Sequence, residues 1–130
     1  MGILAMGGGA VSQTALSIAE AKVSLPLEQA VVRGILCNAL VCLAVWLSYA
    51  ARDVTGKIFA IIFPISAFVA LGFEHSVANM YFIPLAMITE NTITFEQLLG
   101  NLIPVTFGNV LGGSVLVGLV YWIAYRRGQV

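Results

Sequence analysis

An acid and the chain's single histidine stand side by side in the stretch GFEHSVANM at residues 72–80, and both can take part in proton chemistry. The flanking stretches Ile58–Phe73 and Ser76–Thr89 carry no formal charge. Ionisable groups inside an apolar segment are costly unless they are hydrated, paired or neutral. Glu74 and His75 therefore stand out as candidate functional residues.

Composition places these residues in a membrane protein. Of the 130 residues, 60% are hydrophobic and 9% are charged, and the mean hydropathy is +0.99. Six basic and six acidic residues can hardly cover the surface of a soluble domain of this size. A nucleic-acid partner is excluded as well, because the net charge is zero and no Lys/Arg stripe can neutralise phosphates. The lipid bilayer is the predicted surrounding of most side chains.

Metal and disulfide chemistry are not indicated by the cysteines. Cys37 and Cys42 lie in one apolar run and are expected to be small packing residues. Together with a single histidine they make a poor zinc site. We therefore expect no metal and no other cofactor.

Four apolar blocks predict an all-α transmembrane bundle with about three and a half spans. The second block ends in Trp46 and Tyr49, which are typical of the membrane interface. The last block contains a GxxxG spacing at Gly108 and Gly112, which suits close helix packing. In chain order, the predicted elements are a partial helix at 1–21, a helix at 27–51, a broken helix at 58–89 and a helix at 97–126.

The third block needs a break. Residues 58–89 are too many for one straight crossing of about 20 residues and too few for two crossings and a turn. Pro64, Gly72 and Pro84 punctuate the block, and its polar residues lie in the middle. We therefore predict two half-helices joined by a loop at Glu74 and His75, surrounded by protein or water.

Charged connectors predict the orientation. The 52–57 loop is basic, and Arg126 and Arg127 follow the last block. The positive-inside rule places both of these regions in the cytoplasm, with the acidic connector at 90–96 outside. The carboxyl terminus is thus predicted to be cytoplasmic, with Lys22 on the outer side.

His75 has two candidate roles. It could be a core histidine that a neighbour satisfies by a hydrogen bond, but irregular backbone at mid-membrane depth commonly lines a substrate path. Apolar surroundings favour the neutral imidazole, whereas an anion beside it favours the imidazolium. A histidine of this kind suits the passage of a weak acid or its anion.

For the remaining polar residues we consider a structural role and a role in the substrate path. Glu74 is expected to support the loop or a neighbouring helix, because a carboxylate in the path would repel an anion. Asn38 and Asn109 lie inside long apolar runs, so each either joins helices by hydrogen bonds or lines the path and orients His75. Lys22 is either a solvated loop residue or draws anions into a vestibule.

Three separated blocks resemble the formate/nitrite transporter family: GILCNALVCLAVW at 34–46, FVALGFEHSVANMYFIP at 68–84 and NLIPVTFGNVLGG at 101–113. The resemblance implies an aquaporin-like fold in the inner (plasma) membrane. Members are pentamers of six-helix protomers, each built from two inverted three-helix repeats whose second and fifth helices are broken. By this resemblance the broken block at 58–89 is the fifth helix.

The resemblance also implies roles for individual residues and a cargo. It implies transport of a small monovalent anion or its weak acid together with protons, with formate favoured and nitrite or hydrosulfide as alternatives. The residues carried over are His75 as the central pore histidine, Glu74 as the acid before it, Asn38 and Asn109 as pore asparagines, Lys22 as the anion-attracting lysine and Phe68 as a constricting aromatic.

The chain departs from the family in its extent. Relative to that family it begins within the third helix, so we expect it not to form a complete pore alone, and to build a homo-pentamer only within a completed protomer. A non-transporting membrane subunit or truncated remnant is the alternative function. An intramembrane hydrolase using His75 with Glu74 or Ser76 is disfavoured, because sequence neighbours are rarely aligned for proton relay and no nucleophile motif accompanies them.

Overall fold

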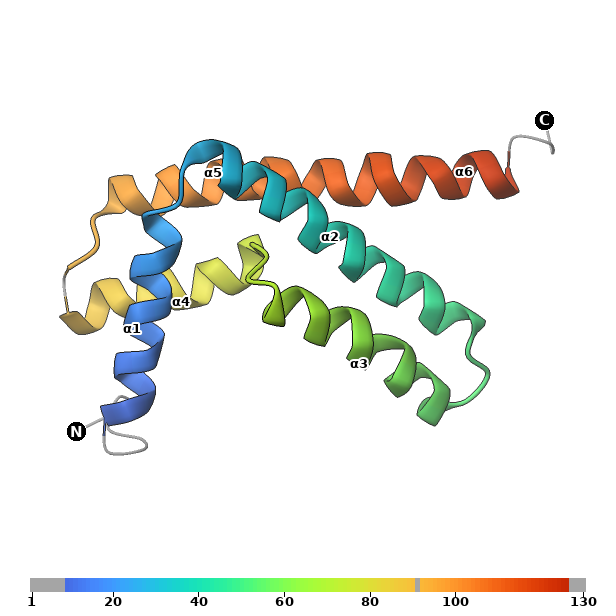
Figure 1. Ribbon diagram of the computed structural model, residues 1–130, viewed down its shortest axis with the longest axis horizontal. Helices are drawn as coiled ribbons and strands as arrows, with labels where there is room; N and C mark the ends of the chain where they lie inside the picture. Colours follow the sequence, from blue (N-terminus) through green and yellow to red (C-terminus); the bar gives the residue numbers. More distant parts are fainter. Residues whose placement is uncertain (1–8, 91, 127–130) are drawn as a thin grey trace.

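The computed structural model describes residues 9–90 and 92–126, and every regular element in that part of the chain is helical (Figure 1). The all-helical class predicted from the sequence is therefore confirmed. Residues 1–8 of the predicted first helix and Arg127 lie outside the described residues. The elements are α1 (Ala10–Val23), α2 (Leu27–Ala50), α3 (Val54–Ala70), α4 (Ser76–Glu90), α5 (Phe95–Leu111), the π-helix η2 (Gly112–Leu119) and α6 (Val120–Tyr125).

The helices form two packed groups, and the long α5 contacts both of them. α2 packs against both α3 and α5, while α1 packs against α4 (Figure 1). α5, η2 and α6 follow one another without a loop and form one long rod. A small apolar core joins α1, α4 and α5, and its buried members are Ala19, Ile83, Ala86, Ile93 and Leu98.

Side-chain caps decide where two of the helices begin. The Asp53 carboxylate accepts a hydrogen bond from the Gly56 N–H at 2.7 Å, so α3 starts at Val54, before the predicted residue 58. Thr94 and Gln97 form a capping box, so α5 starts before residue 97. The predicted starts at residues 58 and 97 were placed where the uncharged runs begin. Polar residues before such a run can cap the helix and start it earlier.

The predicted break in the third block is confirmed and falls at residues 71–75, between α3 and α4. Pro64 and Pro84 lie inside those two helices. The break lies at Gly72 instead, whose φ of +65° is in the left-handed region that favours glycine. The N–H groups of Gly72 and Phe73 donate to the carbonyls of Val69 and Phe68, at 3.1 and 3.0 Å. This is a Schellman motif, which ends a helix with its last carbonyls satisfied.

Glycines bring α2 into backbone contact with α5 and with the start of η2. A Cβ atom on Gly108 would fall on the carbonyl oxygen of Val31, and one on Gly112 would fall on that of Ile35. A Cβ on Gly34 would lie 2.8 Å from the carbonyl oxygen of Val105. Only hydrogen fits at these three positions, which agrees with the close packing predicted from the GxxxG spacing.

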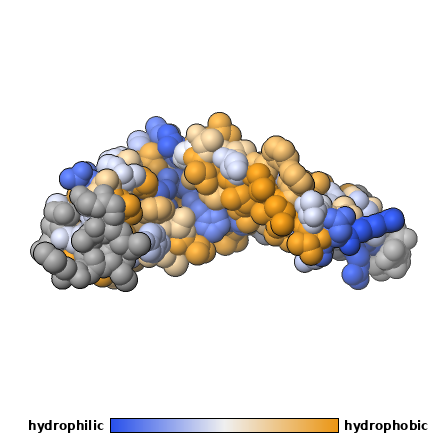
Figure 2. All heavy atoms as spheres, turned by 90° about the horizontal axis from the view of Figure 1, so that it is seen from below, coloured by the Kyte–Doolittle hydropathy of each residue, from blue (hydrophilic) through white to orange (hydrophobic). Residues whose placement is uncertain are grey.

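The outer surface is strongly apolar. By length and composition, two helices could cross a membrane: the 24-residue Leu27–Ala50 and the 31-residue Phe95–Tyr125. Figure 2 shows hydrophobic side chains over much of one face, with hydrophilic ones at the right-hand end, near the middle and in the upper left part. Exposed apolar area of this extent requires lipid or protein to cover it.

The glycine contacts lead to a stability prediction. Gly108→Ala should lower the free energy of unfolding by about 1–3 kcal/mol, because its Cβ collides with backbone that cannot rotate away. Gly100→Ala in the same helix is the matched control, since no heavy atom lies within 4 Å of its added Cβ. Thermal unfolding of the chain in detergent measures both variants. Equal melting temperatures for the two would contradict the close-contact interpretation.

Candidate functional site at the helix break

The amide of Asn109 satisfies the backbone at the break. Its Nδ2 donates to the carbonyl oxygens of Gly34, at 2.8 Å, and Glu74, at 2.9 Å. Its Oδ1 accepts from the Ser76 N–H at 2.9 Å. One buried side chain on α5 thus binds α2, the loop and the first residue of α4. In a bilayer the broken backbone requires such partners, because no water is available to replace them.

Arg33 on α2 provides further contacts to the same loop. Its carbonyl oxygen accepts from the Glu74 N–H and its guanidinium donates to the Gly72 carbonyl, both at 3.4 Å. Sequence reasoning did not single out this residue. It ends a stretch with several charged residues, 20–33, where a solvated position is the ordinary expectation for an arginine.

A buried ion pair lies beside the break. Lys22, in the last turn of α1, has its Nζ 2.8 Å from Glu74 Oε1, and these side chains are 14% and 3% exposed. The solvated-loop interpretation of Lys22 is therefore wrong, since its ammonium is paired inside the protein. The Glu74 carboxylate thereby joins the loop to α1.

Two asparagines close the ion pair into a ring of hydrogen bonds. Asn79 Nδ2 donates to Glu74 Oε2 at 2.6 Å and to Asn101 Oδ1 at 2.7 Å. Asn101 Nδ2 donates to the Lys22 carbonyl oxygen at 2.8 Å. The ring thereby links α1, the loop, α4 and α5. Such contacts offset the cost of burying the two charges.

These asparagines were not among the predicted site residues. Asn79 is one of the polar residues at the middle of the broken block. Its position in the sequence indicates a polar site but not its hydrogen-bond partners. Asn101 lies in the same apolar run as Asn109. The argument that an amide in such a run requires partners applies to both residues equally.

His75 lies at a cavity of about 300 Å³ beside the ion pair. The cavity is lined by Ile18, Lys22, Phe68, Val69, Gly72, Phe73, Glu74, His75, Ala78 and Phe82. The His75 ring is half-buried, and its centroid lies 5.9 Å from that of the Phe68 ring. No hydrogen bond joins the His75 ring to another group in the described part of the chain.

The structure thus brings four of the six predicted residues to one cavity: Lys22, Phe68, Glu74 and His75. Asn109 is placed behind the loop, where it binds backbone. Asn38 does not line the cavity either. Its Nδ2 donates to the Asn109 carbonyl oxygen at 2.6 Å. For these two asparagines the contacts in the described residues are those of helix joining.

Known proteins similar to this chain are membrane transporters and channels. A family model described as "Formate/nitrite transporter" matches residues 1–123. The uncharacterized transporter YrhG of Bacillus subtilis (strain 168) is 49% identical over 92% of this chain and 44% of its own length. The formate channel FocA of Escherichia coli (strain K12) is 41% identical over 86% of this chain and 46% of its own length. The chain spans about half the length of the curated relatives it matches.

Solved structures agree with the fold. A structure described as a "Pentameric formate channel with formate bound" has a TM-score of 0.82 and 36% identity. The match covers 95% of this chain and 56% of that one. An "FNT family ion channel" has a TM-score of 0.84 and 38% identity, over 94% of this chain and 51% of the other.

The ring of polar contacts leads to a second prediction. Lys22→Met should destabilise the chain by about 3–5 kcal/mol, because it leaves the Glu74 carboxylate buried without its counter-ion. Adding Glu74→Gln should recover most of that loss, because the double variant has no buried charge. Thermal unfolding in detergent measures both variants. Glu20→Gln, an exposed change on the same helix, is the control, and a Lys22→Met variant that melts with this control would contradict the buried pair.

Proposed function

The chain belongs to the formate/nitrite transporter family, and on that premise we propose that it forms part of a membrane pore for a small monovalent anion or its weak acid, with formate as the cargo. The observation that carries the proposal is the cavity at the helix break, where Lys22, Phe68 and His75 converge. Nitrite and hydrosulfide are the alternative cargos.

Lys22 supplies the attraction for the anion in this proposal. Its ammonium has three donors, and the contact with Glu74 uses one of them. The others can donate to an anion in the cavity that Lys22 lines. Glu74 would repel the anion if its charge were free. Its two oxygens accept from Lys22 and Asn79, which reduces that repulsion.

His75 supplies the proton or its charge. Since its ring is half-buried and free of hydrogen bonds within the described residues, an arriving anion is a suitable partner for the imidazolium. Along one route the imidazolium gives its proton to formate, neutral formic acid crosses, and the imidazole takes a proton from the solution. Along the other, the imidazolium compensates the anion's charge without transferring the proton.

Phe68 sets the width of the path beside His75. The two rings are tilted by 30° with centroids 5.9 Å apart, so the aromatic face borders the space in front of the imidazole. An apolar constriction excludes hydrated ions, because it offers nothing to replace their hydration shell. A small neutral acid can pass such a constriction.

We propose a plasma-membrane location with the carboxyl terminus in the cytoplasm. The loop between α2 and α3, with Arg52, and the end of α6, with Arg126, lie at the same end of the molecule (Figure 1). Basic residues at one end are typical of a cytoplasmic side. A homo-pentamer is proposed from the similar pentameric formate channel.

Formate flux tests the function. Proteoliposomes are prepared with the chain alone and, because it spans about half of its relatives, with the amino-terminal half of Escherichia coli FocA added. The internal pH is then recorded after a formate pulse. We expect acidification that requires the added half, and flux from the chain alone would overturn the expected incompleteness. No flux in either sample favours a non-transporting membrane subunit.

His75→Ala should abolish the pH dependence of this flux between about pH 5 and pH 8, the range in which an ordinary histidine changes its charge. The flux itself should fall, because the cavity loses the group that compensates the anion. Glu96→Gln, an exposed change at the start of α5, is the control. A His75→Ala profile that overlays the unmodified one would remove His75 from the mechanism.

Phe68→Ala should relax the size selectivity, because the constriction loses its ring. The ratio of lactate flux to formate flux is the measured quantity, and we expect it to rise. Phe59→Ala, an exposed aromatic on the same helix, should leave the ratio unchanged. The same ratio in both variants would place the selective constriction elsewhere.

A further inference from the structure

The long carboxyl-terminal rod changes its hydrogen-bond register directly after the site. η2, over Gly112–Leu119, is a π-helix inserted between α5 and α6, and it starts three residues after Asn109. The backbone on both sides stays helical, with φ and ψ near −61° and −45° at Leu111 and Val120. The rod therefore continues in one direction while its bonds shift from i→i+4 to i→i+5. Such segments are rare and are frequently located at functional sites.

Side chains hold the point where the register changes. Asn38 Nδ2, from α2, donates to the Asn109 carbonyl oxygen at 2.6 Å. Ser114 Oγ donates to the next carbonyl, that of Val110, at 2.5 Å. Two consecutive carbonyls at the junction thus accept side-chain donors. A side chain that inserts at a helical ladder is a recognised cause of a local change in helix geometry.

Gly113 provides the space for the Asn38 amide. A Cβ atom at this position would lie 2.6 Å from Asn38 Nδ2 and 3.1 Å from Cys42 Sγ. A larger residue would therefore displace the amide from the Asn109 carbonyl. This contact depends on a pair of residues, one from α2 and one from η2.

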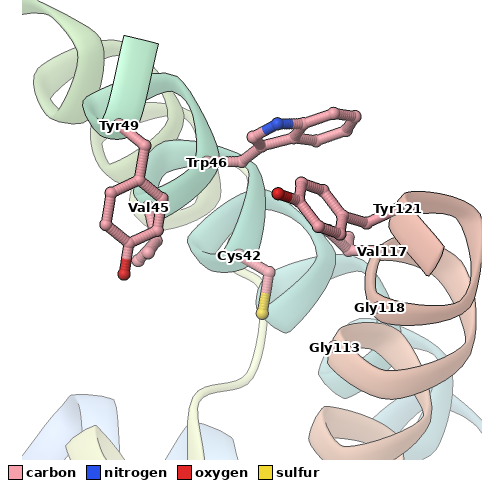
Figure 3. Close-up of a pocket in the computed structure, with 8 residues that line it drawn as sticks. All are labelled: Cys42, Val45, Trp46, Tyr49, Gly113, Val117, Gly118 and Tyr121. Atoms are coloured by element: carbon pink, nitrogen blue, oxygen red, sulfur yellow. The ribbon is translucent and has the colours of Figure 1, made fainter. Parts of the chain in front are cut away.

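The register also shapes a pocket further along the rod. A cavity of about 350 Å³ lies between α2 and the rod (Figure 3). It is lined by Cys42, Val45, Trp46, Tyr49, Gly113, Val117, Gly118 and Tyr121. Tyr121 meets Trp46 edge to face, with ring centroids 5.5 Å apart. A slip of one residue rotates a helix by about 100°, which would turn Tyr121 away from Trp46.

We propose that Asn38 is a positioning residue that holds the α-to-π change of register. Through that register it couples Asn109, at the helix break, to the aromatic pocket formed by Trp46 and Tyr121. Without the amide contact, η2 relaxes toward an α-helix and the pocket loses its Tyr121 side. The proposal concerns the helix register and does not require that the cargo be formate.

Fluorine NMR of the chain in lipid nanodiscs tests the register. 4-Fluorophenylalanine is introduced in place of Tyr121, where the Trp46 ring shifts its resonance, and Trp46→Leu gives the value without that ring. Asn38→Ala should move the resonance toward the Trp46→Leu value. Gly113→Ala should move the resonance in the same direction, because the added methyl group displaces the Asn38 amide although Asn38 itself is unchanged. Ser48→Ala is the control, since its hydroxyl donates to the Val45 carbonyl within α2.

Deletion of Val115 separates register control from general destabilisation. Removing one residue from η2 lets the segment form an α-helix with Tyr121 still facing Trp46, so the resonance should stay near its original position. In that background Asn38→Ala should have no further effect. Two results would overturn the proposal: a resonance that stays in place in Gly113→Ala, or an Asn38→Ala shift that is equally large with and without Val115.

Discussion

The amide of Asn109 is the contact on which the rest of the site depends. It binds the carbonyls of Gly34 and Glu74 and the N–H of Ser76, so that a helix can stop and restart inside an apolar bundle. The Glu74 carbonyl and the Ser76 N–H lie at the break, outside the helical hydrogen bonds, in a medium that offers no water. Because the contact supports the loop from behind, the side chains of the loop are free to face the cavity.

Close helix packing is the condition for that contact. The Asn109 side chain is short, and it reaches the Gly34 carbonyl only because Gly34 and Gly108 let α2 and α5 approach at backbone distance. Backbone contact of this kind is a general route to tight association where both surroundings and helices are apolar. The glycines therefore contribute to the site although none of them carries a functional group.

Polar residues at the break divide into four that bind one another and His75, whose ring lies outside their hydrogen bonds in the described part of the chain. Lys22, Glu74, Asn79 and Asn101 bind one another in a ring, which holds two charges in a buried setting without leaving either unpaired. The His75 ring is bound by no other described group and lies against Phe68 at the cavity. This division suits a path for an acid, because the fixed charges are compensated and the titratable group remains available.

The sequence by itself determined the apolar helices, the interruption at Glu74 and His75, and the family. These depend on composition and on local order along the chain, since apolar length defines a span and a glycine with polar neighbours defines a break. The helix starts at Val54 and Phe95 are also set locally, by the caps Asp53 and Thr94. The prediction missed them because it took each helix to begin with its uncharged run.

Only the tertiary structure decided which polar groups pair. Lys22 and Glu74 are 52 residues apart, and Asn101 is 79 residues from the Lys22 carbonyl it binds, so no local pattern could join them. The π register of η2 was likewise invisible, because it depends on Asn38 from another helix as well as on the glycines of its own segment. Pairing in a membrane is a property of the folded bundle, since each buried amide or charge takes the partner that packing brings within reach.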